Sequence, residues 1–356
     1  MSEQVRIRDS VAELPGYKAG GKALPVDGLS PFKLSSNENP LNPLPSVLAV
    51  IAQAAQSINR YPDPLASELT MRLAQKLSVS TEAIALGTGS VGVCQQIIQA
   101  LCEAGDEVIY AWRSFEAYPI ITSIAGATSV RIGLTASGEH DLVAMANAIT
   151  ERTRVIFICT PNNPTGSIVR HADLEDFMEK VPKNILVVID EAYIEFNKDP
   201  QAIDGLGAIK QYSNVGVLRT FSKAYGLAGL RVGYFVGPEI VSQAVKKTAV
   251  PFGVSSLAQA AAIASLDHES ELLDRVESLV QLRSWFEDEL SQLGFNLVSS
   301  QANFVWLALG DRTEDFAAAC NDVAVAVRPF FGEGVRISIG ERQALERLLP
   351  VCAKFI

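Results

Sequence analysis

The stretch around which we expect this chain to fold is Thr220-Phe-Ser-Lys-Ala-Tyr-Gly-Leu-Ala-Gly-Leu-Arg231. It follows the apolar run 215–218, which predicts a short buried strand, and it places Lys223 where that strand ends. Burial lowers the pKa of a lysine, and the neutral amine can then attack an aldehyde. The glycines that follow let a bulky ligand approach the backbone, and Arg231 can hold a phosphate through its forked guanidinium. Taken alone, the stretch also fits an ordinary loop with a solvated lysine.

The composition describes an acidic chain with a large apolar fraction. Its 356 residues are enough for one large domain or two unequal ones, and 48% of them are hydrophobic, which provides for a sizeable core. The formal net charge of −10 argues against a nucleic-acid partner.

Cysteines, histidines and the N-terminal residues narrow the class further. Five cysteines are scattered without a CxxC pair, so we expect reduced, mostly buried thiols in a cytoplasmic protein. The three histidines lie far apart, and we therefore expect no metal site. The polar N-terminus has no signal-peptide core. The sequence contains no run of about 18 apolar residues, so we expect neither a transmembrane helix nor a membrane partner.

Polar residues follow three apolar runs that read as strands of one sheet. The runs are 155–158, 185–189 and 215–218, and the segments between them are long enough for crossover helices. They lead to Asn163, to Asp190 with Tyr193, and to Ser222 with Lys223. Each ending alone fits a turn. Together they predict a ligand site at the carboxyl edge of an open α/β sheet.

A glycine-rich loop precedes the helix predicted over 93–102. The loop Gly87-Thr-Gly-Ser-Val-Gly92 can bind an anion, because free N–H groups and the positive end of the helix dipole face the ligand. We expect Gly89, Ser90 and Val91 to hold a phosphate there, although a glycine-rich loop by itself is a weak signal.

After about residue 240 the pattern changes to that of a smaller α+β domain. An amphipathic helix is predicted over 272–293 and another over 313–322. Short strands are predicted over 295–298, 304–309, 323–327 and 335–339. This part carries Arg328 and Arg336, which could bind a ligand or could be ordinary surface arginines.

Taken together, these segments resemble the fold-type I aminotransferases that depend on pyridoxal 5′-phosphate (PLP). The lysine signature of that family is Ser/Thr-x-Ser-Lys with an arginine eight residues after the lysine, as at 220–231 here. Leu34-Ser-Ser-Asn-Glu-Asn-Pro40 and Arg60-Tyr-Pro62 also resemble the histidinol-phosphate/aromatic amino acid aminotransferase subgroup. The resemblance implies an α/β fold with a mainly parallel seven-stranded sheet flanked by helices. It also implies an N-terminal arm and part of the small domain over 1–45, a large PLP-binding domain over 46–240 and a small C-terminal domain over 241–356.

The resemblance also implies roles for individual residues. Lys223 would bind PLP covalently, Asp190 would pair with the pyridine nitrogen, and Tyr193 would complete the catalytic set. The other cofactor contacts would come from Gly89, Ser90, Val91, Phe115, Asn163, Thr220, Ser222 and Arg231, with Tyr61 supplied by the partner subunit of a homodimer. Substrate contacts would come from Tyr17, Asn37, Arg328 and Arg336.

The expected substrates follow from the branch that the chain resembles. The segments 89–96 and 251–259 resemble the aromatic branch, and Val91-Gly92 stands where histidinol-phosphate enzymes commonly have an acidic pair. We therefore expect transamination of aromatic amino acids with 2-oxoglutarate, giving aromatic 2-oxo acids and L-glutamate. A histidinol-phosphate aminotransferase is the nearest alternative, followed by a PLP-dependent amino-acid-phosphate decarboxylase. A non-catalytic PLP sensor of a transcription regulator is disfavoured, because no basic helix-turn-helix segment is recognisable.

Overall fold

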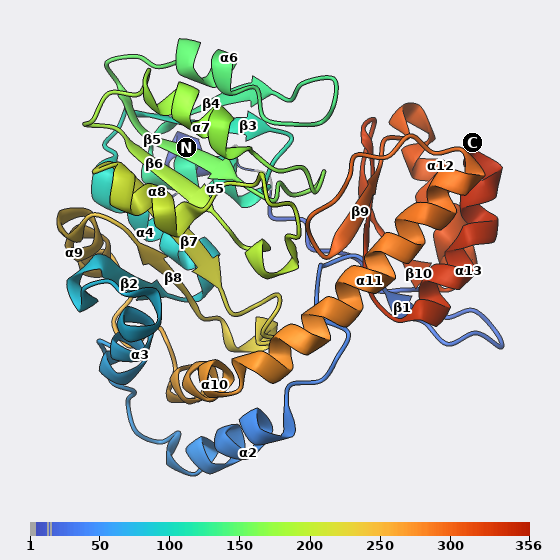
Figure 1. Cartoon of the computed structure of the whole chain (residues 1–356), viewed down its shortest axis with the longest axis horizontal. Helices are drawn as coiled ribbons and strands as arrows, with labels where there is room; N and C mark the ends of the chain where they lie inside the picture. The colour runs from blue at the N-terminus through green and yellow to red at the C-terminus, as the bar shows by residue number, and fades with distance from the viewer. Residues whose placement is uncertain (1–4, 13, 15) are drawn as a thin grey trace.

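A seven-stranded sheet with helices on both faces forms the larger part of the computed structural model, which describes residues 5–12, 14 and 16–356 (Figure 1). We call this part the large domain. Its strands are β2 (Ile84–Gly87), β3 (Glu107–Trp112), β4 (Thr128–Gly133), β5 (Thr153–Cys159), β6 (Leu186–Asp190), β7 (Val215–Thr220) and β8 (Gly233–Val236). Their order is β2-β8-β7-β6-β5-β3-β4, and only β8 runs antiparallel to its neighbours. The predicted, mainly parallel seven-stranded sheet is confirmed.

The central strands β5 and β6 are almost entirely apolar because both of their faces are buried, whereas the edge strand β4 is partly exposed. In β5, Val155 and Phe157 join one core cluster and Ile156 and Ile158 join the other, as the two-residue period of a strand requires. The first cluster includes residues of α4 (Gly89–Leu101), α5 (Ala117–Ala125) and α9 (Glu239–Lys247). The second includes residues of α6 (Leu142–Asn147), α7 (His171–Met178) and α8 (Gly205–Gln211).

A second, smaller unit follows the long helix α11 (Glu269–Leu293), which runs between the two parts of the molecule (Figure 1). We call this unit the small domain. An antiparallel sheet of order β11-β12-β9 forms its centre, built from β9 (Phe304–Leu307), β11 (Arg328–Phe330) and β12 (Gly334–Ser338). Helices α12 (Thr313–Asp322) and α13 (Arg342–Cys352) and the short strand β10 (Val325–Ala326) complete it.

One strand predicted in this region is wrong, and two are shorter than predicted. Residues 295–298 form no strand, because Phe295 and Leu297 pack against the apolar core while the backbone of the segment has no β partner in the described part of the chain. The strand predicted over 304–309 ends at Leu307, and the strand predicted over 323–327 is reduced to the two residues of β10.

The N-terminal arm touches both parts of the molecule. Helix α1 (Asp9–Ala12) contacts α5 of the large domain, and β1 (Phe32–Lys33) pairs in parallel with β10 of the small domain. The chain then returns through α2 (Pro45–Ala54), which packs on α10 (Ser256–Asp267), and α3 (Ser67–Leu77) follows (Figure 1). The arm predicted to be irregular therefore contains two short elements. The domain boundaries at 45 and 240 remain a prediction.

In the described part of the chain there are also six single turns of 3-10 helix, at 55–57, 81–83, 194–196, 228–230, 310–312 and 353–355. All five cysteines are buried thiols, as predicted. Among the described residues, no helix combines the length and the apolar character needed to span a membrane.

Candidate active site

A cavity of about 260 Å³ lies where β5, β6 and β7 end, with the arm and the small domain supplying its other walls. It brings together most of the residues that the sequence singled out. These are Tyr17, Asn37, Ser90, Val91, Phe115, Asn163, Asp190, Tyr193, Thr220, Ser222, Lys223, Arg231, Arg328 and Arg336. The carboxyl edge of the sheet is thus the site, as expected for an open α/β fold. Gly89 and Tyr61 are not among the lining residues of this cavity.

Lys223 is a partly buried amine that lines the site. Its Nζ donates hydrogen bonds to the backbone oxygens of Ser36 (3.3 Å) and Asn37 (3.2 Å). Burial, and then the positive charge of Arg336, lower the pKa of Lys223 to about 7. A large fraction of this lysine is therefore a neutral, nucleophilic amine near neutral pH.

Asp190, the last residue of β6, is a buried carboxylate held by a tyrosine. The hydroxyl of Tyr118 donates to Oδ2 at 2.6 Å, and the backbone N–H of Ala192 donates to Oδ1 at 3.2 Å. Burial raises the pKa of Asp190 to about 6, and the two hydrogen bonds oppose that rise. An ionised Asp190 is thus a hydrogen-bonded but buried negative charge that a cationic ligand group would stabilise.

The start of α4 and Arg231 form an anion-binding end of the cavity. Thr88 caps α4 without a side-chain hydrogen bond in the described structure, so the first N–H groups stay available near Ser90. Arg231 donates from Nη1 to Ser222 Oγ at 3.2 Å and has a φ of 57°, a strained value for a non-glycine residue. Gly89 has a φ of 76°, and a side chain on it would collide with the Arg231 guanidinium, so glycine is needed for this approach.

Arg336 lies on β12 and points into the cavity from the small domain. Its Nη1 donates to Asn163 Oδ1, and its Nη2 donates to the backbone oxygen of Ser35 at 2.9 Å. Its Nε is buried without a hydrogen-bond partner among the described residues. A buried, unpaired donor on a cation is costly, and the carboxylate of a ligand would satisfy it.

Arg328 lies on β11, next to Arg336, and forms an ion pair inside the cavity. Its Nη2 donates to Glu116 Oε2 at 2.7 Å, and its guanidinium lies 5.4 Å from the centre of the Phe330 ring. Only 10% of the Arg328 side chain is exposed.

The sequence did not single out several polar partners that the structure reveals. Tyr118 holds Asp190, Glu116 holds Arg328, and Ser338 Oγ accepts from the backbone N–H of Asn37 at 2.8 Å. Glu116 and Tyr118 follow the predicted residue Phe115 by one and three positions. Their proximity to Phe115 was the only sign in the sequence that they lie near the site. Their hydrogen-bond partners could not be predicted, because these depend on how the strands and domains are arranged.

Comparison with known proteins agrees with this geometry. The sequence profile described as "Aminotransferase class I and II" matches residues 30–351. The chain belongs to this family of aminotransferases. It is 55% identical over 350 residues to a protein of Streptomyces avermitilis named aromatic amino acid aminotransferase, covering 98% of this chain and 97% of that protein. The protein of the same name from Thermobifida fusca is 54% identical over 334 residues, covering 94% and 92%.

Solved structures of aminotransferases share the fold. The histidinol-phosphate aminotransferase of Sinorhizobium meliloti, solved in complex with pyridoxal-5′-phosphate, superimposes with a TM-score of 0.86 at 27% identity, covering 99% of this chain and 98% of that one. Aspartate aminotransferase of Thermus thermophilus, solved with maleate, has a TM-score of 0.80 at 24% identity, covering 92% of each chain.

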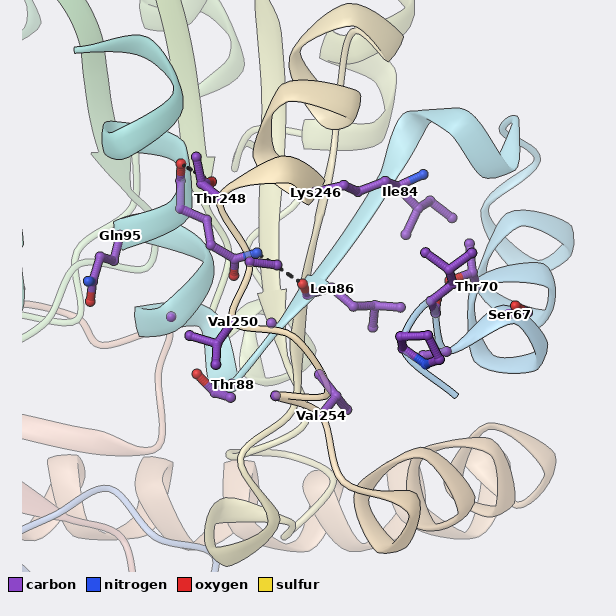
Figure 2. A pocket seen from close by; sticks show the side chains of 18 of the residues that line it. Ser67, Thr70, Ile84, Leu86, Thr88, Gln95, Lys246, Thr248, Val250 and Val254 are labelled. Atoms are coloured by element: carbon purple, nitrogen blue, oxygen red, sulfur yellow. Dashed lines mark hydrogen bonds between the residues drawn. The ribbon is translucent and has the colours of Figure 1, made fainter. Parts of the chain in front are cut away.

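A second cavity, of about 380 Å³, is lined by residues around the start of α4, among them Thr88 (Figure 2). Its walls include Leu86 of β2, the α4 glutamine Gln95 and the segment from Lys246 to Val254 (Figure 2). Its lining contains one carboxylate, Glu82, and one amine, so it lacks the convergence of charged groups seen around Lys223.

The raised pKa of Asp190 predicts a pH-dependent effect on stability in the cofactor-free protein. The ionised form is the costly one, so its penalty is present above pH 6 and disappears as the pH falls through 6 towards 4. We expect Asp190→Asn to raise the free energy of unfolding at pH 8 by about 2–3 kcal/mol and to lose this gain below pH 4. Urea unfolding of both proteins across this range measures the effect. A variant less stable than the parent at pH 8 would contradict the assignment of Asp190 as a destabilising buried charge.

Proposed function

We propose that this aminotransferase binds PLP and transfers the amino group between aromatic amino acids and 2-oxoglutarate, producing aromatic 2-oxo acids and L-glutamate. The observation that carries the proposal is the convergence of Lys223, Asp190 and Arg336 in one shielded cavity. A nucleophilic amine, a buried carboxylate and a cation with an unpaired donor are the protein groups that this chemistry needs.

The cavity fits PLP at both of its ends. Ser90, Ser222 and Arg231 offer donors for a phosphate at the start of α4, where a glycine avoids a collision with the guanidinium. At the other end, Asp190 lies where a protonated ring nitrogen would relieve the cost of its buried charge. When bound, PLP supplies an aldehyde for an amino group and a conjugated ring that accepts the electron pair left on Cα. Phe115 lines the same cavity and offers an aromatic face to that ring.

The residues around Lys223 suit it to covalent binding and proton transfer. Its lowered pKa lets Nζ act as a nucleophile and then as a general base near pH 7. Tyr193 lies beside it, with its ring 5.7 Å from Nζ and its hydroxyl accepting from Asn37 Nδ2 at 3.0 Å. We assign Tyr193 and Asn163 to the ring oxygen of the cofactor.

Arg336 and the surrounding aromatic rings suit an aromatic amino acid. The unpaired Nε of Arg336 can complete a forked contact with an α-carboxylate, which orients Cα–H for removal by Lys223. Tyr17 provides apolar surface for a substrate ring in the same cavity. The relatives that are 54–55% identical carry the name aromatic amino acid aminotransferase, which supports the same substrate class.

We further propose that two copies of the chain form a homodimer in the cytoplasm, in which Tyr61 reaches the partner's phosphate site. Tyr61 is 83% exposed and stacks on Phe252 at a centroid distance of 4.6 Å. Leu65 and Val250 are also strongly exposed, line the second cavity, and lie close to this pair in sequence. An exposed apolar face of this kind is typical of an interface between subunits.

Trapping with borohydride tests the assignment of Lys223. The protein incubated with PLP and reduced should carry the cofactor on the peptide that contains Lys223, as read by mass spectrometry. Lys223→Ala should lose this adduct, while a surface control, Lys210→Ala, should keep it, because Lys223 is the partly buried amine of lowered pKa in the cavity and Lys210 is an exposed lysine outside its lining. A lysine adduct that persists in Lys223→Ala would show that another lysine binds the cofactor.

Kinetic comparison tests the substrate class. We expect kcat/KM for phenylpyruvate to exceed that for histidinol phosphate by at least about tenfold, equivalent to ~1.4 kcal/mol. Arg336→Ala should lower kcat/KM for every carboxylate substrate. A tenfold preference for histidinol phosphate would overturn the aromatic assignment and leave the aminotransferase family membership intact.

Mixing of two weakly active variants tests whether each active site contains residues from both subunits. Tyr61→Ala and Lys223→Ala should each be weakly active as homodimers. Unfolded and refolded together, they should regain up to about a quarter of the parental activity, because one site of each mixed dimer receives both native residues. Sedimentation checks that all samples are dimers. Failure of the mixture to exceed the separate variants would contradict the crossing of Tyr61.

A further inference from the structure

Two ion pairs of opposite polarity join one loop of the large domain to one hairpin of the small domain. The loop spans 113–116, between β3 and α5, and the hairpin connects β11 to β12. Arg113 of the loop pairs with Glu333 of the hairpin turn, and Glu116 of the loop pairs with Arg328 of β11. The pairs share a setting, since the Phe330 ring lies 5.5 Å from the Arg113 guanidinium and 5.4 Å from that of Arg328.

The two pairs differ in their access to the candidate active site. Glu116 and Arg328 line the cavity, whereas Arg113 and Glu333 are not among its lining residues. Arg328 also donates to the backbone oxygen of Ala19, at 3.4 Å, so its guanidinium is held on two sides. The Glu116 side chain is 29% exposed, so it can reach water if it leaves Arg328.

The cations around the cavity suggest what Arg328 can bind. Arg231 lies at the anion-binding end beside Ser222, and Arg336 has the buried unpaired Nε that suits one carboxylate. A substrate with a second carboxylate needs one more cation near Arg336. Arg328 is adjacent, since Arg328 and Arg336 are register partners of β11 and β12. Its place for a carboxylate is already taken by Glu116.

We propose that Glu116 determines substrate specificity by competing with the side-chain carboxylate of dicarboxylic substrates for Arg328. This inference rests on the proposed function and deepens it. An aromatic substrate leaves the Glu116–Arg328 pair intact and lies beside a neutralised, flat guanidinium. A dicarboxylic substrate displaces Glu116 into water and takes over Arg328. One cavity thereby accepts both unlike partners of the reaction, and the strength of the pair sets the balance between them.

Binding of unreactive acids to the PLP-loaded protein tests the competition directly. The probes are glutarate, with two carboxylates, and 3-phenylpropionate, with one carboxylate and a ring, and calorimetry gives each Kd. Glu116→Gln keeps the size of the side chain and removes its charge. We expect it to lower the Kd of glutarate about tenfold, the order of one charge-assisted hydrogen bond, and to change that of 3-phenylpropionate less than about twofold.

Glu333→Gln is the matched control. It removes one negative charge from the Arg113–Glu333 ion pair. Glu333 belongs to the same hairpin but does not line the cavity. We expect it to change both Kd values less than about twofold. In the double variant with Glu116→Gln and Arg328→Gln the gain for glutarate should vanish, because the gain acts through Arg328.

The outcomes separate this inference from the proposed function. A selective gain for glutarate in Glu116→Gln supports the competition, and a matching rise in kcat/KM for 2-oxoglutarate relative to phenylpyruvate supports its role in turnover. Equal shifts for both probes, or the same shift in Glu333→Gln, would overturn it as a general effect of charge. If the parent transaminates phenylpyruvate and the gain is absent, only the competition fails. If the gain is present and no transamination occurs, only the proposed function fails.

Discussion

Asn37 makes the contacts on which the geometry of the site depends. Its side chain donates to Tyr193 at 3.0 Å and accepts from Ser338 Oγ at 2.9 Å, and its backbone oxygen accepts from Lys223 and Asn303, each at 3.2 Å. One residue of the arm thus connects the large domain, the small domain and the reactive amine. Its φ of 53° is held by these bonds, a strained backbone of the kind that persists where surrounding structure determines it.

Burial of charge gives the site its chemistry. The same desolvation lowers the pKa of Lys223 and raises that of Asp190, because in each case it disfavours the charged form. Arg336 remains a cation in this environment and adds to the lowering at Lys223. The charges that the fold leaves unsatisfied are those that a phosphorylated, cationic ring and a carboxylate would satisfy. In this sense the cofactor-free protein is destabilised at its site, and ligand binding would relieve that cost.

The positions of two cavity arginines depend on contacts between the two domains. Arg328 and Arg336 belong to neighbouring strands of the small domain, yet their partners Glu116 and Asn163 belong to the large domain. The position of both arginines is therefore set by how the domains meet. Since α11 and the arm both join the domains, the geometry of this part of the cavity is coupled to domain packing.

Local sequence pattern was sufficient to predict three neighbouring strands of the large sheet, β5, β6 and β7, and the edge at which they end, while the family resemblance supplied most of the other residues expected in the cavity. Buried parallel strands are continuous apolar runs, and polar residues at their ends have few other uses. Tertiary structure alone decided the partners: Tyr118 reaches Asp190 only because β3, β5 and β6 are neighbours, and Glu116 reaches Arg328 across a distance of 212 residues in the chain. It also decided that 295–298 packs as irregular chain, because a strand needs a partner that no single stretch of sequence specifies.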